Sequence, residues 1–135
     1  MSDQELFEVR VEVAFEAIHA VGPDGGPAPP HDHRWQVAVR ARSEKLDPIA
    51  IVVDFRKLRD DAQRLVDTVT GQRLEEHPAL AGAPATPFAI GQWILRSLEA
   101  DARGADYRIE AVEVECEPGI RWVIGRETVA ARRPV

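Results

Sequence analysis

Three of the four histidines, His19, His31 and His33, lie close together in the sequence. In an extended chain, residues two apart point to the same side, so His31 and His33 can face one ion while Asp32 points away. Neutral imidazoles suit zinc, and three protein ligands leave a fourth position for water or substrate, as in catalytic sites. A His-x-His pair alone is common, so ordinary strand residues remain the alternative. His77, in a polar stretch before a proline, is expected to be a solvated surface residue.

Alternating sequence patterns predict the strands that would position these rings. From Phe7 to Ala17 the odd positions are apolar and most even positions are charged, and His19 continues the apolar phase. A second alternating run covers residues 34–42, and His33 is in phase with its apolar set. Between the two runs, the segment Val21 to Pro30 holds three glycines and four prolines, which predicts a loop. If the two strands pair, the three rings can converge.

Two helices are predicted in the middle of the chain. Asp54 is an acceptable N-cap, and apolar residues recur at helical spacing from Phe55 to Val69. Thr86 followed by Pro87 is typical of a second helix start, because proline is tolerated at the first helical position.

The end of the chain predicts a β-hairpin. Two β-rich runs, Ile109 to Cys116 and Ile120 to Ile124, flank the turn dipeptide Pro118-Gly119. The order strand, strand, helix, helix, strand, strand predicts an α+β fold in one domain spanning residues 1–135. In this fold a four-stranded antiparallel sheet carries both helices on one face. Such a sheet has free edges, and edges are often paired with another subunit, so oligomerisation is expected.

Composition narrows the class of protein. The chain has 135 residues, of which 44% are hydrophobic and 30% are charged, as in globular domains. A formal charge of -6 and a pI near 5.2 argue against a nucleic-acid surface. Cys116 is the only cysteine, which excludes an internal disulfide and a thiolate metal cluster. The first five residues do not resemble a signal peptide and no apolar run is long enough to cross a membrane, so we expect a cytoplasmic protein.

Several segments resemble a known family, the 6-pyruvoyltetrahydropterin synthase and 6-carboxytetrahydropterin synthase group, which has the tunnelling fold or T-fold. Residues 15–19 resemble its Phe-x-Ala-x-His segment, and residues 31–35 resemble its His-Gly-His segment followed by a polar residue and an aromatic. Residues 52–58 and 85–94 are similar to the segments that open its two helices. The resemblance is in order and covers most of the chain.

This resemblance implies a function and an assembly. In the family, the residues that match His19, His31 and His33 hold zinc. The zinc binds and acidifies the hydroxylated side chain of a dihydropterin triphosphate, while a cysteine and an Asp-His pair move protons. The resemblance also implies a homo-oligomer in which strands of neighbouring subunits close into a barrel and active sites lie between subunits. A small-molecule substrate is therefore expected, with neither nucleic acid nor membrane as partner.

Four positions depart from the family pattern. The family cysteine corresponds to Pro27, and the Asp-His pair corresponds to Thr70 and Gly71. The glutamate that anchors the pterin corresponds to Cys116, with Glu117 beside it. A one-residue slip turns a strand side chain to the opposite face, so Glu117 is a replacement only if the last hairpin is shifted. The pattern indicates a divergent member that retains the metal ligands.

The sequence therefore predicts a zinc-dependent lyase, cyclase or isomerase-like enzyme, cleaving a carbon-oxygen or carbon-carbon bond in a small polar metabolite that need not be a pterin. Glu117 is the candidate substrate-binding residue. Asp24 and Glu117 are candidate proton-transfer groups, although each is more often a plain solvated carboxylate, and no residue is assigned as catalytic. Two alternatives stay open: a conventional pterin or deazapurine-pathway synthase with rearranged acid-base residues, and a catalytically silent metal-binding subunit. In a silent subunit the histidines would lie buried with no pocket leading to them.

Overall fold

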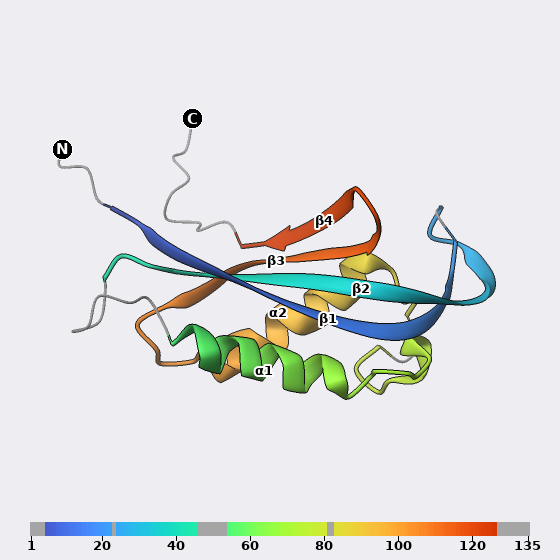
Figure 1. Cartoon of the computed structure of the whole chain (residues 1–135), viewed down its shortest axis with the longest axis horizontal. Helices are drawn as coiled ribbons and strands as arrows, with labels where there is room; N and C mark the ends of the chain where they lie inside the picture. The colour runs from blue at the N-terminus through green and yellow to red at the C-terminus, as the bar shows by residue number, and fades with distance from the viewer. Residues whose placement is uncertain (1–4, 23, 46–53, 81–82, 127–135) are drawn as a thin grey trace.

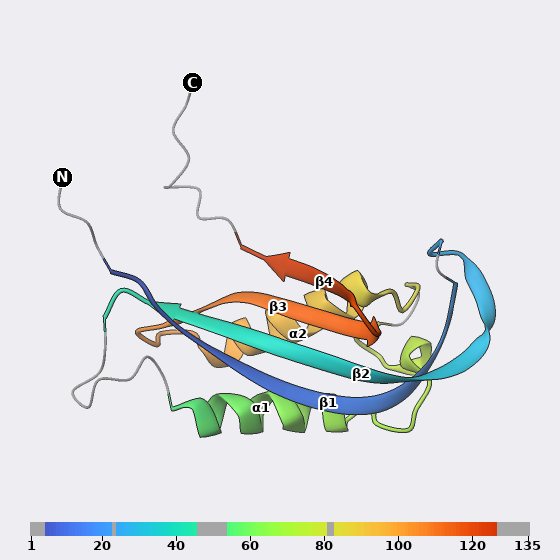
Figure 2. The ribbon, with the colours of Figure 1, turned by 45° about the horizontal axis from the view of Figure 1, so that its top comes forward.

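The computed structural model describes residues 5–22, 24–45, 54–80 and 83–126. Within these residues, four strands form one antiparallel sheet in the order β1-β2-β3-β4 (Figure 1). The strands are β1 (Phe7–Val21), β2 (Pro27–Ser43), β3 (Arg108–Glu117) and β4 (Ile120–Gly125). The helices are α1 (Phe55–Asp67), the short 3₁₀ helix η1 (Leu74–Glu76) and α2 (Pro87–Asp101). Figure 2 shows α1 and α2 on the same side of the sheet, so the predicted α+β architecture is confirmed.

The core lies between the sheet and these helices. The odd residues of β1 face it, and Val11, Val13 and Phe15 stand opposite Val39, Val37 and Trp35 of β2. Trp35 is fully buried, and its indole N–H donates to the Ala17 carbonyl over 3.2 Å. The alternation in the sequence therefore predicted correctly which face of both strands is buried.

Both helices begin directly after the predicted N-cap residues, Asp54 and Thr86. The Asp54 carboxylate accepts the backbone N–H of Arg56 at the start of α1, and the Thr86 hydroxyl accepts that of Ala89 at the start of α2. Each bond satisfies one of the backbone donors that a helix start leaves free. Helix α1 packs against β1, and α2 packs against β3 and β4. Their buried positions are Leu58, Ala62, Val66, Ile90, Gly91, Ile94, Leu95 and Leu98.

The predicted loop from Val21 to Pro30 is wrong in its extent. Strand β1 continues to Val21 and β2 already begins at Pro27, which leaves residues 22–26 as the connection. Extended backbone suits proline, and its missing N–H is tolerated where no ladder bond is needed. The ladder is irregular there, because the register shifts between His19 and Val21. The apolar run at residues 49–53 that was expected before α1 lies outside the described residues.

The opposite face of the sheet is charged. Glu113 on β3 is 8% exposed and pairs with Arg10 of β1 over 3.0 Å and with Arg121 of β4 over 3.1 Å. These ion pairs link three strands across the middle of the sheet. Among the described helices, none has the length and apolar character needed to cross a lipid bilayer.

Candidate metal centre

The pairing of β1 with β2 brings the three histidines together. His19 and His31 are direct partners in the ladder, and His33 lies two residues further along β2, opposite Ala17. The ring centroids are 4.5 Å apart for His19 and His31, 4.9 Å for His19 and His33, and 4.6 Å for His31 and His33. One nitrogen of each ring lies within 4.8 Å of the other two. The rings therefore converge as the phases of the two strands predict.

Backbone carbonyls orient two of the rings. Nδ1 of His19 lies 3.0 Å from the Ala85 carbonyl oxygen, and Nδ1 of His31 lies 2.9 Å from that of Pro29. A carbonyl oxygen only accepts, so in both rings the Nδ1–H donates and Nε2 carries the free lone pair. Metal-ligating histidines are usually held by this kind of outer hydrogen bond.

The donor set fits zinc. His19 is 4% exposed, and its Nε2 is buried with no hydrogen-bond partner among the described residues. A buried acceptor without a partner is costly, and a bound cation would remove this cost. Burial, together with the neighbouring His19 and His31 rings, lowers the pKa of His33, which favours the neutral form that binds metals. Three neutral imidazoles are a typical ligand set for zinc.

The segment between the helices holds the end of β1 that carries His19. The Gly71 N–H donates to the Glu16 carbonyl over 2.8 Å, and the Ile18 N–H donates to the Gln72 carbonyl over 3.0 Å. One residue beyond His19, the N–H of Ala20 donates to the Glu75 carboxylate. These three bonds cover the outer edge of β1 beside the metal site, and a covered edge is less free to pair elsewhere.

The histidines line a pocket of about 520 Å³, hereafter the metal pocket. Asp24, Cys116 and Glu117 line the same pocket. Cys116 and Glu117 are neighbours on β3, and strict alternation would send them to opposite faces. The pairing of β3 with β4 shifts register between Val114 and Glu117, and irregularities of this kind re-aim side chains. The shifted hairpin therefore brings Glu117 to the metal pocket.

The two candidate carboxylates differ in what they contact. Oδ1 of Asp24 accepts the Gly26 N–H over 2.9 Å and so closes the turn between β1 and β2. The Glu117 carboxylate is exposed, and no hydrogen bond to it is made within the described residues. Its charge acts on His33, where it opposes the lowering of the pKa. Burial and the adjacent Glu117 raise the pKa of the Cys116 thiol, which keeps it protonated.

A protein-family model decides the relationship that the motifs suggested. The model for 6-pyruvoyl tetrahydropterin synthase matches residues 8–127. The chain belongs to this family. Members of this family are lyases, which supports an enzymatic role for the chain. No curated protein sequence matches the chain.

Solved structures share the fold. The 6-pyruvoyl tetrahydropterin synthase of Caenorhabditis elegans has a TM-score of 0.76 at 16% identity, covering 94% of this chain and 100% of that one. An uncharacterized protein from Wolinella succinogenes has 0.74 at 17% identity, covering 91% and 99%. The Plasmodium vivax synthase has 0.71 at 16% identity, covering 92% and 99%. The T-fold expectation is therefore confirmed, and the low identities agree with a divergent family member.

Of the four positions that depart from the synthase pattern, Cys116 lines the metal pocket and the other three do not. Pro27, Thr70 and Gly71 are not among the residues that line the metal pocket. Gly71 instead bonds the edge of β1, as described above. His77 is only partly exposed and packs on Trp93 with ring centroids 4.9 Å apart, which corrects its expected place as a solvated residue.

Several residues around the site were not found from the sequence. Phe88 and Trp122 line the metal pocket and pack edge to face with ring centroids 5.0 Å apart. They come from the start of α2 and from β4, so no sequence spacing joins them. Glu75 was also missed, because its role depends on a backbone group 55 residues away.

Proposed function

We propose that this chain is a zinc-dependent lyase or cyclase-type enzyme whose substrate is a small metabolite other than the pterin of its family. The observation that carries the proposal is the set of three converging histidines, with the unpartnered Nε2 of His19, at a pocket that is open to a ligand. That pocket also argues against a silent metal-binding subunit, in which the histidines would be sealed from ligands.

The chain's own residues have distinct roles in this proposal. His19, His31 and His33 would hold zinc through ring nitrogens, and the carbonyls of Ala85 and Pro29 would keep two of the rings in place. Zinc, when bound, would polarise a hydroxyl or carbonyl oxygen of the substrate and make a neighbouring proton more acidic.

Glu117 is the best candidate to move that proton. Its carboxylate lines the pocket, influences His33 electrostatically and has no competing bond within the described residues. Asp24 is less suited, because its carboxylate already accepts the Gly26 N–H. We propose that Glu117 binds the substrate and accepts a proton from the carbon or oxygen next to the polarised group. A Plasmodium vivax synthase variant in which a glutamate becomes alanine is described as a catalytic-residue mutant, which supports a carboxylate role in this fold.

The replaced positions support a substrate change. Thr70 and Gly71 cannot act as the acid-base pair, and Pro27 has no proton to give. The protonated thiol of Cys116 cannot replace the negative charge of a ring-anchoring carboxylate. The second candidate is a conventional pterin synthase with rearranged acid-base groups, because the family match supports it.

We also propose that residues 1–135 form one domain that assembles into a homo-oligomer. Strand β4 is an edge of the sheet in the described part of the chain, and its Val123 side chain, which does not line the metal pocket, is nearly half exposed. Exposed apolar residues on an open edge favour pairing with a second subunit.

Proton exchange tests this proposal directly. Zinc-loaded protein is incubated with hydroxyacetone in heavy water, and exchange of the protons next to the carbonyl is followed by NMR. We expect catalysed exchange that falls about a hundredfold in Glu117→Gln with zinc content unchanged. Glu115→Gln is the matched control, because Glu115 bonds the Gly119 N–H and does not line this pocket. Equal exchange with and without protein would refute the proposal, and turnover of dihydroneopterin triphosphate would favour the second candidate.

A further inference from the structure

The metal pocket has a second wall that the zinc chemistry does not use. It is lined by apolar side chains from the end of β1, the start of helix α2 and the last hairpin. They are Val21, Pro87, Phe88, Ile120 and Trp122. One pocket therefore holds both the candidate metal ligands and a set of apolar side chains.

Two of these side chains are exposed to an unusual degree for their size. Phe88 is 47% exposed and Ile120 is 46% exposed, although both are large and apolar. Phe88 meets the partly buried Trp122 edge to face at 5.0 Å, an arrangement that leaves ring surface free for a third group. Exposed apolar surface gathered in a pocket typically marks a ligand site.

The charges of the pocket restrict the ligand further. Its ionisable groups besides the histidines and the thiol are the carboxylates of Asp24 and Glu117. Neither lysine nor arginine is among the described residues that line it. A phosphate group prefers such cations, and two carboxylates nearby repel it.

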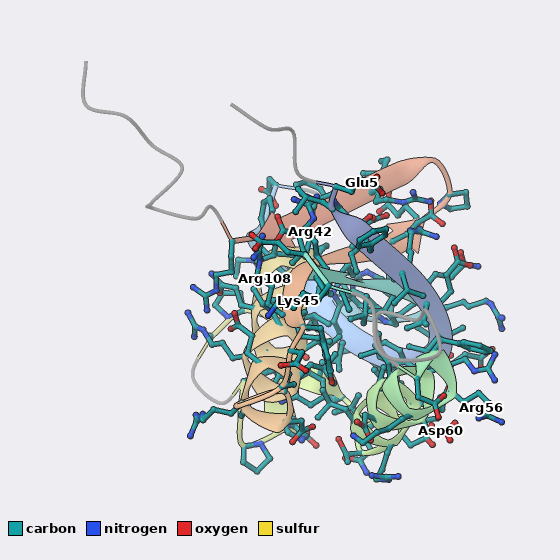
Figure 3. The ribbon with its side chains drawn as sticks, turned by 90° about the vertical axis from the view of Figure 1, so that its left-hand side faces the viewer. Glu5, Arg42, Lys45, Arg56, Asp60 and Arg108 are labelled. Atoms are coloured by element: carbon teal, nitrogen blue, oxygen red, sulfur yellow. The ribbon has the colours of Figure 1, made fainter. Side chains whose placement is uncertain are left out.

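A group of basic residues lies at the other end of the sheet. Arg42 and Arg108 are direct partners between β2 and β3, and Lys45 follows the end of β2. Figure 3 shows these three side chains at the end of the molecule near the start of β1, whereas the histidines lie near the end of β1. The described residues that line the pocket therefore supply no lysine or arginine to a phosphorylated substrate.

We infer that the substrate is an uncharged molecule with an aryl or similar apolar group attached to a carbon skeleton bearing a hydroxyl and a carbonyl oxygen. The oxygens face the histidines and Glu117, and the apolar group packs on Phe88 and Trp122. This inference rests on the proposed function, because it names the substrate class of that same site. The pocket volume of about 520 Å³ is ample for both parts of such a molecule.

Three matched probes test the inference by calorimetric titration of the zinc-loaded protein. They are α-hydroxyacetophenone, hydroxyacetone and dihydroxyacetone phosphate, which share a hydroxyl beside a ketone and differ in bearing a phenyl, a methyl or a charged phosphate group. We expect the phenyl compound to bind at least about tenfold more tightly than hydroxyacetone, since burying an aromatic ring is worth that much. The phosphate compound should bind no more tightly than hydroxyacetone.

Two variants locate the preference. Phe88→Ala and Trp122→Ala should each weaken binding of the phenyl compound by about fivefold and leave that of hydroxyacetone unchanged. Phe55→Ala is the matched control, because Phe55 is 50% exposed, begins a helix and does not line the pocket. Tryptophan fluorescence gives a second readout, since quenching by the phenyl compound should shrink in Trp122→Phe.

The outcomes separate this inference from the proposed function. Tighter binding of the phosphate compound than of hydroxyacetone would overturn the inference. So would a preference for the phenyl compound that is unchanged in both variants. In either case the zinc binding and the Glu117-dependent proton exchange of the proposed function would stand. If the protein binds no zinc, the proposed function fails. The apolar side chains of the pocket are then tested in the metal-free protein by fluorescence. Quenching by the phenyl compound that is lost in Trp122→Phe would support the inference, and an absence of quenching in the parent would overturn it.

Discussion

The middle of the sheet and the end that carries the histidines are built differently. From Phe7 to His19, β1 pairs with β2 in unbroken register, and charged side chains on the outer face are joined in ion pairs. At the histidine end, register shifts occur after His19 and between Val114 and Glu117, and Nε2 of His19 has no hydrogen-bond partner among the described residues. Regular pairing stabilises the middle, whereas irregular pairing frees side chains for a ligand at the end.

Trp35 joins the two regions, so its loss should have the largest effect. It is fully buried against Phe15, and its ring centroid lies 5.0 Å from that of His19. We expect Trp35→Ala to lower the free energy of unfolding of the metal-free protein by about 3–5 kcal/mol in urea titrations. Trp122→Ala, at a partly buried site, should lower it by clearly less. Equal losses of stability in the two variants would mean that Trp35 is not more important to the core than Trp122.

Glu75 should matter at the histidine end alone. Its carboxylate fixes the backbone next to His19, so Glu75→Ala should weaken zinc affinity by about tenfold, measured by competition with a chelator. Glu75→Gln keeps an oxygen that can accept the Ala20 N–H and should restore most of the affinity. The exposed neighbour gives a control in Glu76→Ala. An unchanged zinc affinity in Glu75→Ala would show that Glu75 does not support the metal site.

Glu113 should matter in the middle alone, and its effect should depend on pH. The hydrogen bond from Arg10 is the main reason that its pKa lies below the usual 4.5, with the charges of Arg10 and Arg121 adding to it. The ionised carboxylate therefore stabilises the fold above pH 4.5, and this contribution disappears as the pH falls through the lowered pKa.

Glu113→Gln should consequently lower the free energy of unfolding by about 1 kcal/mol at neutral pH, and the difference from the parent should shrink in acid. Urea titrations across the acid range measure this. Glu12→Gln is the control, because Glu12 also pairs with Arg10 but is mostly exposed. A difference that grows in acid would contradict the assigned sign.

Cys116 should give the smallest effect, although the family resemblance matches its position with an anchoring glutamate. Its thiol has a raised pKa and is not among the groups that converge with the histidine nitrogens. We expect Cys116→Ser to change zinc affinity and proton exchange by less than about twofold, a margin too small to signify a ligand. A tenfold loss in either quantity would instead make the thiol part of the site.

The regular region was predictable from the sequence and the irregular one only in part. Alternation identified the buried faces of β1 and β2, and the caps at Asp54 and Thr86 marked both helix starts. Convergence of the histidines followed from the same alternation, because His31 and His33 are two residues apart.

The remainder depends on contacts between distant segments. The shift beside Glu117 depends on how β3 pairs with β4, and the support of Ala20 comes from Glu75 in another part of the chain. The loop was predicted too long because proline was read as excluding a strand, whereas it only removes one ladder donor. Local pattern contains none of this information.

The metal content of the purified protein tests the central claim most directly. Elemental analysis is made on the parent and on the His31→Ala, His33→Ala double variant, with circular dichroism to verify that both are folded. The account predicts one zinc per chain in the parent and none in the folded double variant. A parent purified without chelator that contains no metal, or a double variant that retains it, would contradict the three-histidine zinc site.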